Sequence, residues 1–396
     1  FMEGGGLNRP GATILALAAT VLLTALEIGW LVGCGGAPEG VQNEPRASEP
    51  VPDALVARER EAQRELRSLR RDTGTRIVLV GLDGVDWQIA EPLMQRGLLP
   101  NLGRLRRSGA WGNIKALRPI LSPLLWTSVA TGVEADRHGV LDFLVRDAAS
   151  GELVPVNSRF RKVRALWNVF SDAGLSTDVV AWWATWPAET VNGHLVSDRV
   201  AYSLFDVDVP AGEAGVTHPA SYLDEVRGQL VSDAQISYEE ISRFVDISPD
   251  EYRSARGRVV EDPAAGFRQP VNHLARILAS TRNYHRIALD LLGERQADLT
   301  AVYYQMIDEV CHRFMHFMPP RPEGVAEADV LRYGRAVERA YEYQDRLLGE
   351  LLDRVAPDST VIVLSDHGFL NGADRPRGAV SYTHLTLPTI PRWCRS

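Results

Sequence analysis

The sequence has few of the residues that build disulfide frameworks or bind nucleic acid. Its 396 residues include three cysteines, Cys34, Cys311 and Cys394, which are too few and too scattered for a disulfide framework or a cysteine-based zinc site. It has no long basic run and a net charge of −8, so we expect no nucleic-acid-binding surface. Nine histidines and 51 acidic residues still allow a metal site made of imidazoles and carboxylates.

An apolar stretch near the N-terminus, residues 11–33, is interrupted by Glu27 and would be an imperfect membrane span. It ends in an LVGC sequence at Cys34, which resembles the lipidation box of a bacterial lipoprotein signal. We therefore expect residues 1–34 to be a signal or membrane anchor, with an uncleaved signal anchor as the alternative to lipidation. Both interpretations place the rest of the protein outside the cytoplasm, in the periplasm or on the cell surface.

A connecting region, residues 35–75, follows this anchor. Residues 35–53 are rich in Gly, Pro, Glu and Ser, which is typical of a flexible tether. Residues 54–71 combine Arg and Glu with scattered Leu and Val, which predicts a solvated helix. With 45% hydrophobic and 24% charged residues, the chain can form one large or two medium globular domains.

Three β-rich segments, each with an apolar core, lead into side chains that can bind a metal ion. They are Asp83 after residues 77–80, Asp308 and His312 after residues 298–307, and Asp366 and His367 after residues 361–364. Open α/β sheets bind ligands at the carboxyl ends of their strands, so we expect these side chains to meet at one edge. Taken singly, each segment could also be a strand end with solvated polar residues or an amphipathic helix with polar caps.

Ser122 precedes Pro123 at the start of a helix that is expected to run to about residue 130. Serine is a favoured N-cap residue, and proline suits the first turn of a helix. A helix N-terminus is also an anion site, because its N–H groups are free and its dipole end is positive. Ser122 could therefore be a simple cap or a hydroxyl directed at a phosphate.

In their order along residues 76–377, these motifs resemble the alkaline phosphatase superfamily, and most of all its bacterial type I phosphodiesterase/nucleotide pyrophosphatase branch. The family's metal-binding motifs match Asp83 in LVGLDGVDW, Asp308 and His312 in DEVCH, and Asp366 and His367 in SDHG. The family nucleophile lies ten residues before the Gly of a Thr-Gly pair, which selects Ser122 over Thr127 and Ser128. The resemblance implies an alkaline-phosphatase-like three-layer α/β/α sandwich with a mostly parallel sheet.

The resemblance also implies a metal-dependent hydrolase with two divalent metal ions, most typically Zn²⁺. One ion would be held by Asp83, Asp366 and His367 with Ser122 as its fourth ligand, and the other by Asp308, His312 and a further histidine. Ser122 would attack a small-molecule phosphoester, either a phosphodiester or a nucleotide pyrophosphate, and form a phosphoseryl intermediate.

One position departs from the phosphodiesterase pattern. Members of this group often carry an Asn after a His-Gly pair to hold the phosphate, but His138-Gly139 is followed by Val140. Another superfamily activity therefore stays open: a phosphomonoesterase, a phosphoglycerate mutase-like enzyme or a phosphotransferase. A non-catalytic surface protein that retains the fold is the third alternative.

We expect residues 76–379 to form the catalytic domain, with a cap-like insertion at about 203–284 that governs substrate selectivity. The family's last metal-binding histidine lies well after the Asp-His-Gly motif, where this sequence has only His384. The surrounding VSYTHLTLPT resembles a translated sequencing-library adapter, so residues 380–396 are expected to be non-native and the domain incomplete. In the alternative, His384 belongs to a divergent tail and is a ligand.

Overall fold

The computed structural model describes residues 53–69, 73–147, 151–200, 215–257, 269–294 and 296–370. The expected signal at residues 1–34, the tether up to residue 52 and the tail at residues 380–396 with His384 lie outside the described residues. Among the described helices, none combines the length and the apolar character needed to cross a membrane. Helix α2 (Asp53–Leu69) matches the expected solvated helix and spans the boundary between two units, residues 1–65 and 66–396. The rest of this description concerns the second unit.

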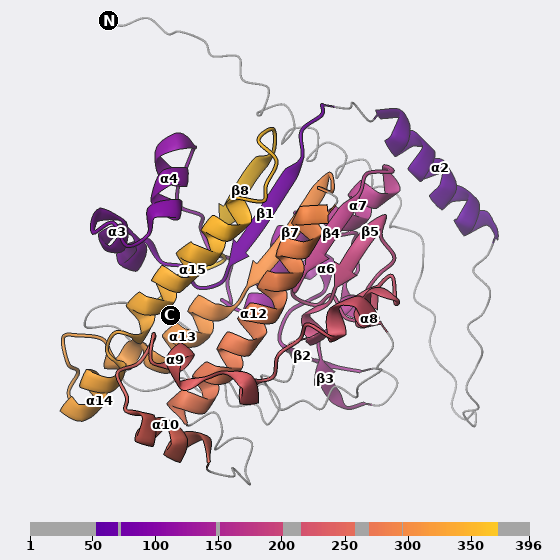
Figure 1. Cartoon of the computed structure of the whole chain (residues 1–396). Helices are drawn as coiled ribbons and strands as arrows, with labels where there is room; N and C mark the ends of the chain where they lie inside the picture. The colour runs from indigo at the N-terminus through magenta and orange to yellow at the C-terminus, as the bar shows by residue number, and fades with distance from the viewer. Residues whose placement is uncertain are drawn as a thin grey trace, which may run out of the picture. The chain divides into compact units, whose positions relative to one another are not determined.

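A mostly parallel sheet organises this unit (Figure 1). Its strands are β1 (Ile77–Leu82), β4 (Thr177–Val180), β5 (Gly193–Val196), β6 (Thr217–His218), β7 (Leu299–Tyr304) and β8 (Thr360–Leu364). Their order is β6-β5-β4-β7-β1-β8, and only β6 runs antiparallel to its neighbour. Strands β1, β4 and β7 are buried over nearly their whole length because helices cover both faces of the sheet. The expected fold class, α/β with a mostly parallel sheet, is confirmed.

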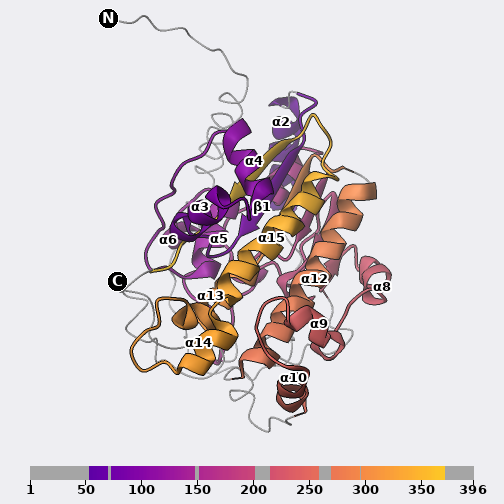
Figure 2. The ribbon, with the colours of Figure 1, turned by 60° about the vertical axis from the view of Figure 1, so that its left-hand side comes forward.

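Two long helices, α12 (Pro270–Glu294) and α15 (Ala336–Leu352), lie side by side on one face of the sheet (Figures 1 and 2). Near α15 lie α3 (Trp87–Gln95), α4 (Pro100–Ser108) and α13 (Met306–Phe314). On the other face, α5 (Ser122–Thr131) and α7 (Leu166–Asp172) pack together, and α6 (Ala135–His138) packs against α5. The sheet is therefore the middle layer of three.

The remaining described elements are short. They are a hairpin of β2 (Leu144–Arg146) and β3 (Leu153–Pro155), the helices α8 (Tyr222–Arg227), α9 (Tyr238–Ile241), α10 (Pro249–Arg256) and α14 (Glu327–Tyr333), and the 3₁₀ turns η2 (Ser158–Phe160), η4 (Asp233–Gln235) and η5 (Met315–Phe317). The range expected as a cap-like insertion, about 203–284, contains β6 and the start of α12. Because β6 pairs with β5, part of this range belongs to the main sheet.

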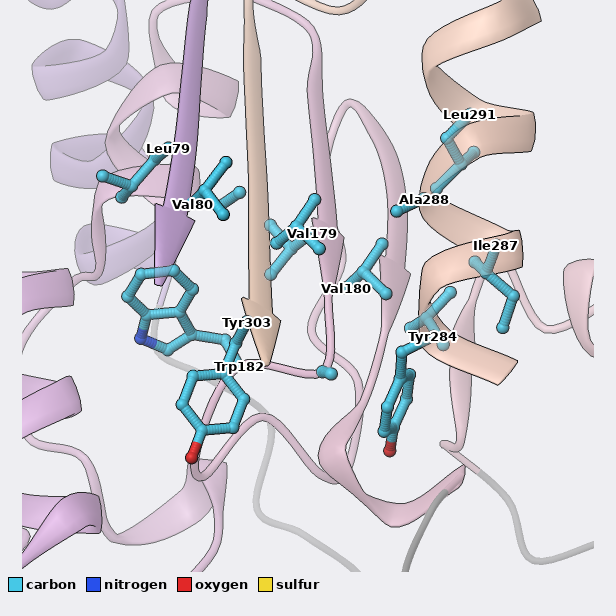
Figure 3. Packing of buried hydrophobic residues seen from close by; sticks show 14 of the residues in the cluster. Leu79, Val80, Val179, Val180, Trp182, Tyr284, Ile287, Ala288, Leu291 and Tyr303 are labelled. Carbon is cyan, nitrogen blue, oxygen red and sulfur yellow. The ribbon is translucent and has the colours of Figure 1, made fainter. Parts of the chain in front are cut away.

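Buried apolar side chains form one large cluster on the sheet and a second cluster under α9, α13 and α14. In the first cluster, Ile287, Ala288 and Leu291 of α12 lie toward Val180 (Figure 3). Trp182 and Tyr303 lie on the opposite side of the sheet, where β4 and β7 end (Figure 3). This packing fixes the strand ends that carry the functional residues.

Two helices differ from what their sequence patterns predict. Apolar residues at helical spacing over residues 331–352 predict one helix, but the structure has two, α14 and α15, separated at Gly334, where the chain turns. Residues 282–293 predict a helix, and α12 extends well beyond them, over 25 residues. By contrast, the Leu- and Arg-rich residues 89–108 predict a helical region broken at Pro100, and this is confirmed, since Pro100 begins α4.

Strand β8 is less buried than its apolar run of residues 361–364 predicted. None of these residues is fully buried, and Ile362 is 38% exposed. The reason is position: β8 pairs only with β1 and is the last strand of the sheet among the described residues. An apolar run therefore predicted the strand correctly but not its place at the edge.

Gly81 of β1 tests how tightly the α5 face is packed. A Cβ atom at this position would lie 2.7 Å from Cζ3 of Trp126, which is closer than van der Waals contact allows. We expect Gly81→Ala to lower the free energy of unfolding by about 1–3 kcal/mol, as overpacked cores do. Urea denaturation measures this change. Gly228→Ala is the matched control, because no atom lies within 4 Å of its Cβ position. A loss of stability as large in the control would contradict the packing explanation.

Candidate metal centre

The carboxyl ends of β1, β7 and β8 bring three predicted ligands together. Ligand atoms of Asp83, Asp308 and His367 all lie within 4.8 Å of one another. Nε2 of His367 is 3.3 Å from Oδ1 of Asp83 and 3.6 Å from Oδ1 of Asp308. Since β1 is flanked by β7 and β8, its end is the natural meeting point of the three segments.

Two more of the predicted ligands, His312 and Asp366, join the same group. Asp308 and His312, one turn apart on α13, approach to 3.2 Å between Oδ1 and Nε2. Oδ2 of Asp366 lies 3.7 Å from Nε2 of His367, in the turn that follows β8. The four-residue spacing of Asp308 and His312 predicts one shared helix face, and Asp366 and His367 can meet only at a bend; both features are present.

Asp83 is held in one orientation by aromatic donors. Its Oδ2 accepts a hydrogen bond from Nε1 of Trp126 at 3.0 Å and another from the hydroxyl of Tyr303. Its Oδ1 receives no hydrogen bond from the described residues and faces His367. One carboxylate oxygen is thus used by the protein, and the other is presented to the centre.

A second carboxylate, Asp86, ties the loop after β1 to the loop after β8. Its Oδ1 accepts the N–H of Gln88 at 2.7 Å and caps α3, while its Oδ2 accepts the N–H of Phe369 at 2.9 Å. Gly368 allows this approach, because a Cβ there would lie 2.2 Å from Oδ2 of Asp86. The Ser365 hydroxyl also accepts the N–H of Val85 at 2.9 Å. These bonds fix Asp83 relative to His367.

Ser122 is the first residue of α5 and is 7% exposed. The N-cap position belongs to Leu121, and no side chain makes a capping hydrogen bond, so of the two alternatives for Ser122 the simple cap is wrong. Trp126 lies one turn further along the same side of α5 and donates to Asp83. Ser122 and Trp126 therefore share one side of α5, and the side chain of Trp126 reaches Asp83.

Ser128 and His138 are hydrogen-bonded like a catalytic serine and its general base, but this histidine cannot take the serine proton. The N–H of Val140 donates to Nδ1 of His138 at 3.1 Å, so the neutral ring carries its proton on Nε2. Nε2 then donates to the Ser128 hydroxyl at 2.9 Å, and that hydroxyl donates to the carbonyl of Leu124. Burial, with a contribution from Arg161, lowers the pKa of His138 to about 4, so the ring stays neutral at pH 7. The role of this hydrogen bond is therefore structural, because it joins α5 to α6.

The centre concentrates negative charge where water is excluded. Burial, followed by the charge of Asp308, raises the pKa of Asp83, and burial followed by the charge of Asp83 raises the pKa of Asp366 well above its ordinary value. Burial alone would lower the pKa of His312, but the nearby Asp308 outweighs it and raises the value. The carboxylates therefore need positive charge to ionise together.

The donor set fits divalent metal ions. Three carboxylates and two imidazoles are ligands typical of zinc and related ions. Neither carboxylate oxygen of Asp366 receives a hydrogen bond from the described residues, although the group is buried. Buried carboxylate oxygens without donors are costly unless a cation compensates them. These residues can thus hold a metal ion.

The sequence did not predict the residues that support the ligands. The patterns around Trp126 and Tyr303 predict only a helix and a strand, and Asp86, although it lies inside the motif of Asp83, has no role that the sequence indicates. The AWWATWPAE segment, residues 181–189, also resembles the family and predicts a structural or pocket-lining role; its Trp182 and Trp183 are buried. The position of Cys311 beside His312 predicts a buried packing thiol rather than a ligand. Cys311 is buried and free, and burial raises the pKa of its thiol well above the ordinary value, in agreement with that prediction.

Sequence comparison identifies the family pattern over most of the chain. The type I phosphodiesterase/nucleotide pyrophosphatase family model matches residues 77–384. A search of curated proteins found no significant match. The family match includes every residue of the centre, and it confirms the resemblance found in the sequence motifs.

Comparison with solved structures gives more distant similarities. Phosphonoacetate hydrolase from Sinorhizobium meliloti 1021, in complex with phosphonoformate, is 18% identical with a TM-score of 0.41, and the match covers 74% of this chain and 56% of that chain. Murine ectonucleotide pyrophosphatase/phosphodiesterase 5 is 15% identical with a TM-score of 0.38, covering 74% and 57%. The chain therefore spans little more than half the length of these proteins.

Asp366→Asn tests the electrostatic description of the centre without metal. In the folded protein the pKa of Asp366 is raised, so the unfolded chain ionises first as the pH rises above the ordinary value of 3.8. The metal-free protein should therefore lose stability as the pH rises from there toward the folded pKa. Asp366→Asn removes this loss and should raise the free energy of unfolding at pH 7 by about 1–3 kcal/mol.

Thermal or urea unfolding in a chelator, at pH 5 and pH 7, measures the effect. Asp345→Asn is the matched control: this buried carboxylate accepts the N–H groups of Asn101 and Leu102, so its replacement should destabilise the protein. A metal-free Asp366→Asn protein that is less stable than the parent at pH 7 would contradict the description.

Proposed function

The chain belongs to the type I phosphodiesterase/nucleotide pyrophosphatase family, and from this premise we propose that it hydrolyses small-molecule phosphoesters with Ser122 as the nucleophile. The convergence of Asp83, Asp308 and His367 from three strand ends carries the proposal, because it forms a buried anionic centre that fits metal ions. His312 and Asp366 complete the set of described ligands.

Two divalent ions, with Zn²⁺ as the first candidate, balance the charge of this centre. The carboxylates of Asp83, Asp308 and Asp366 and the deprotonated Ser122 oxygen together carry four negative charges, which equals the charge of two such ions. By family resemblance, Asp83, Asp366, His367 and Ser122 hold one ion, and Asp308, His312 and a further histidine hold the other. When bound, the ions lower the pKa of the serine hydroxyl and offset the charge of the phosphoryl group.

The described residues suit the two chemical steps of such a reaction. The Ser122 oxygen attacks phosphorus, the bond from phosphorus to the leaving-group oxygen breaks, and a phosphoseryl group forms. Water then attacks that phosphorus and frees the serine. Free N–H groups in the first turn of α5 bind the phosphoryl oxygens during both steps, because Leu121 and Ser122 leave the helix N-terminus without a side-chain cap.

The surroundings of Val140 favour a monoester as the alternative substrate. Val140 is fully buried in a small apolar cluster, and its N–H is engaged by His138. This position therefore cannot supply the phosphate contact that an Asn supplies in many phosphodiesterases of the group. A phosphomonoesterase activity thus competes with hydrolysis of a phosphodiester or nucleotide pyrophosphate. The apolar N-terminal segment supports an extracytoplasmic, membrane-anchored location for either activity.

Ser122→Ala tests the nucleophile. We expect turnover of bis-p-nitrophenyl phosphate and p-nitrophenyl phosphate to fall by roughly 10³-fold or more, because the attacking oxygen is lost. Zinc content, measured by atomic absorption, should fall by less than half, because the histidine and carboxylate ligands remain. Ser128→Ala is the control on the same helix and should keep most of the turnover. Equal turnover in Ser122→Ala and the parent would rule out the nucleophile, and the ratio of the two substrates distinguishes diesterase from monoesterase.

Metal removal tests the cofactor. A saturated protein should hold about two zinc ions per chain, and chelation should abolish turnover reversibly. The further histidine that completes the second ion's ligands is the open question. If His384 is not this histidine, replacing residues 380–396 with the matching segment of a longer family member should raise both zinc content and turnover. No zinc binding and no turnover in either form would contradict the hydrolase and leave a non-catalytic surface protein.

A further inference from the structure

The two oxygens of Asp83 have opposite surroundings. Oδ2 is bonded by two donors, Trp126 and Tyr303, and Oδ1 faces His367 without a hydrogen bond from the described residues. The whole side chain is 1% exposed, so water does not compete for either oxygen. A carboxylate can bind a metal ion through one oxygen or two, and this arrangement leaves one available.

Tyr303 is itself held by a third aromatic residue. Nε1 of Trp183 donates to the Tyr303 hydroxyl at 2.7 Å, which leaves the hydroxyl proton to go to Asp83. Each donor in this series therefore points toward Asp83: Trp183 donates to Tyr303, and Tyr303 donates to Asp83.

The packing around these rings leaves little freedom. The ring centroids of Trp126 and Tyr303 lie 5.1 Å apart, and Gly81 opposite Tyr303 gives Trp126 the space to reach Asp83. Nε1 of Trp182 also donates to the carbonyl of Trp126 at 3.0 Å. Figure 3 shows Trp182 and Tyr303 together at the ends of β4 and β7.

Backbone strain beside these tryptophans supports a functional role. Ala181 and Ala184, on either side of Trp182 and Trp183, have φ angles of 65° and 55°, in the left-handed region that alanine adopts only with strain. Asp198 stabilises this turn by accepting the N–H groups of Ala184 and Trp186, both at 3.0 Å. Strain of this kind persists where the surrounding structure requires one conformation, and it is concentrated at functional sites.

We propose that Tyr303 is a positioning residue for the metal centre: together with Trp126 it occupies Oδ2 of Asp83, so that Asp83 binds a metal ion through Oδ1 alone. Trp183 orients the Tyr303 hydroxyl for this purpose. The inference rests on the proposed metal centre. It adds three aromatic residues, contributed by α5, β7 and the loop after β4, to the ligands that the sequence motifs contain. Such supporting hydrogen bonds typically change metal affinity about 10–100-fold.

Tyr303→Phe removes the hydroxyl and keeps the ring. Tyr304→Phe is a closely matched control: Tyr304 is adjacent on β7, is equally buried, and hydrogen-bonds through its hydroxyl to Nδ1 of His285 at 2.7 Å on the opposite face. Both changes remove one buried hydroxyl, but only the first removes a donor to Asp83. The affinity of the full chain for Zn²⁺ alone is measured by competition with a chromophoric chelator, and thermal unfolding of the metal-free proteins verifies folding.

We expect about 10–100-fold weaker zinc binding in Tyr303→Phe and less than threefold change in Tyr304→Phe. The visible absorption of bound Co²⁺ should weaken in Tyr303→Phe only, because a second Asp83 oxygen can then bind and raise the coordination number. Trp183→Phe should also weaken zinc binding. The double variant with Tyr303→Phe should bind zinc little more weakly than Tyr303→Phe alone, since both changes act through the Tyr303 hydroxyl.

Three negative outcomes lead to two different conclusions. If the parent protein binds zinc and Tyr303→Phe binds it equally well with an unchanged Co²⁺ spectrum, the positioning role is wrong and the metal centre stands. Equal weakening in Tyr303→Phe and Tyr304→Phe would also overturn the role, because the effect would then be general to buried hydroxyls. If the parent binds neither Zn²⁺ nor Co²⁺, the metal centre fails, and the inference fails with it.

Discussion

The burial of three carboxylates at one edge of the sheet is the constraint on which the site depends. Asp83, Asp308 and Asp366 are each less than a tenth exposed, and mutual repulsion adds to the cost of removing them from water. A fold tolerates this arrangement only when cations or protons compensate the charge. The surrounding structure therefore holds the three groups in place although, without a cation, they repel each other.

The rigidity comes from parallel strands and from loops that are bonded to each other. β1 lies between β7 and β8, so its end has structured neighbours on both sides, and Asp86 links its loop to the loop of β8. On the α5 face, aromatic side chains fill the space beneath Asp83 and direct their N–H and O–H groups at it. Apolar packing and hydrogen bonding thus act on the same carboxylate, which is how a site at the strand ends keeps its geometry.

Two sequence patterns indicate the right type of local structure but not the right position within it. The apolar run before Asp366 predicted a buried strand, but β8 is at the edge of the described sheet, and its side chains are only partly covered. Ser122 was compatible with an N-cap by residue type, yet the backbone places Leu121 there and makes Ser122 the first helical residue. The position of β8 in the sheet decides how far its side chains are buried, and a difference of one residue decides whether Ser122 is the cap or the first residue of the helix. Local sequence preferences are too weak to determine either.

The sequence by itself determined the fold class, the order of the motifs and five candidate ligands in the described chain, because apolar runs ending in Asp and His carry their own local signal. Only the tertiary structure decided that Trp126, Tyr303 and Trp183 support Asp83. These residues come from segments that are far apart in the sequence, and an aromatic residue in an apolar run is equally suited to ordinary core packing. Their function depends on which donor reaches which oxygen, and that follows from strand register and helix packing, which no single segment encodes.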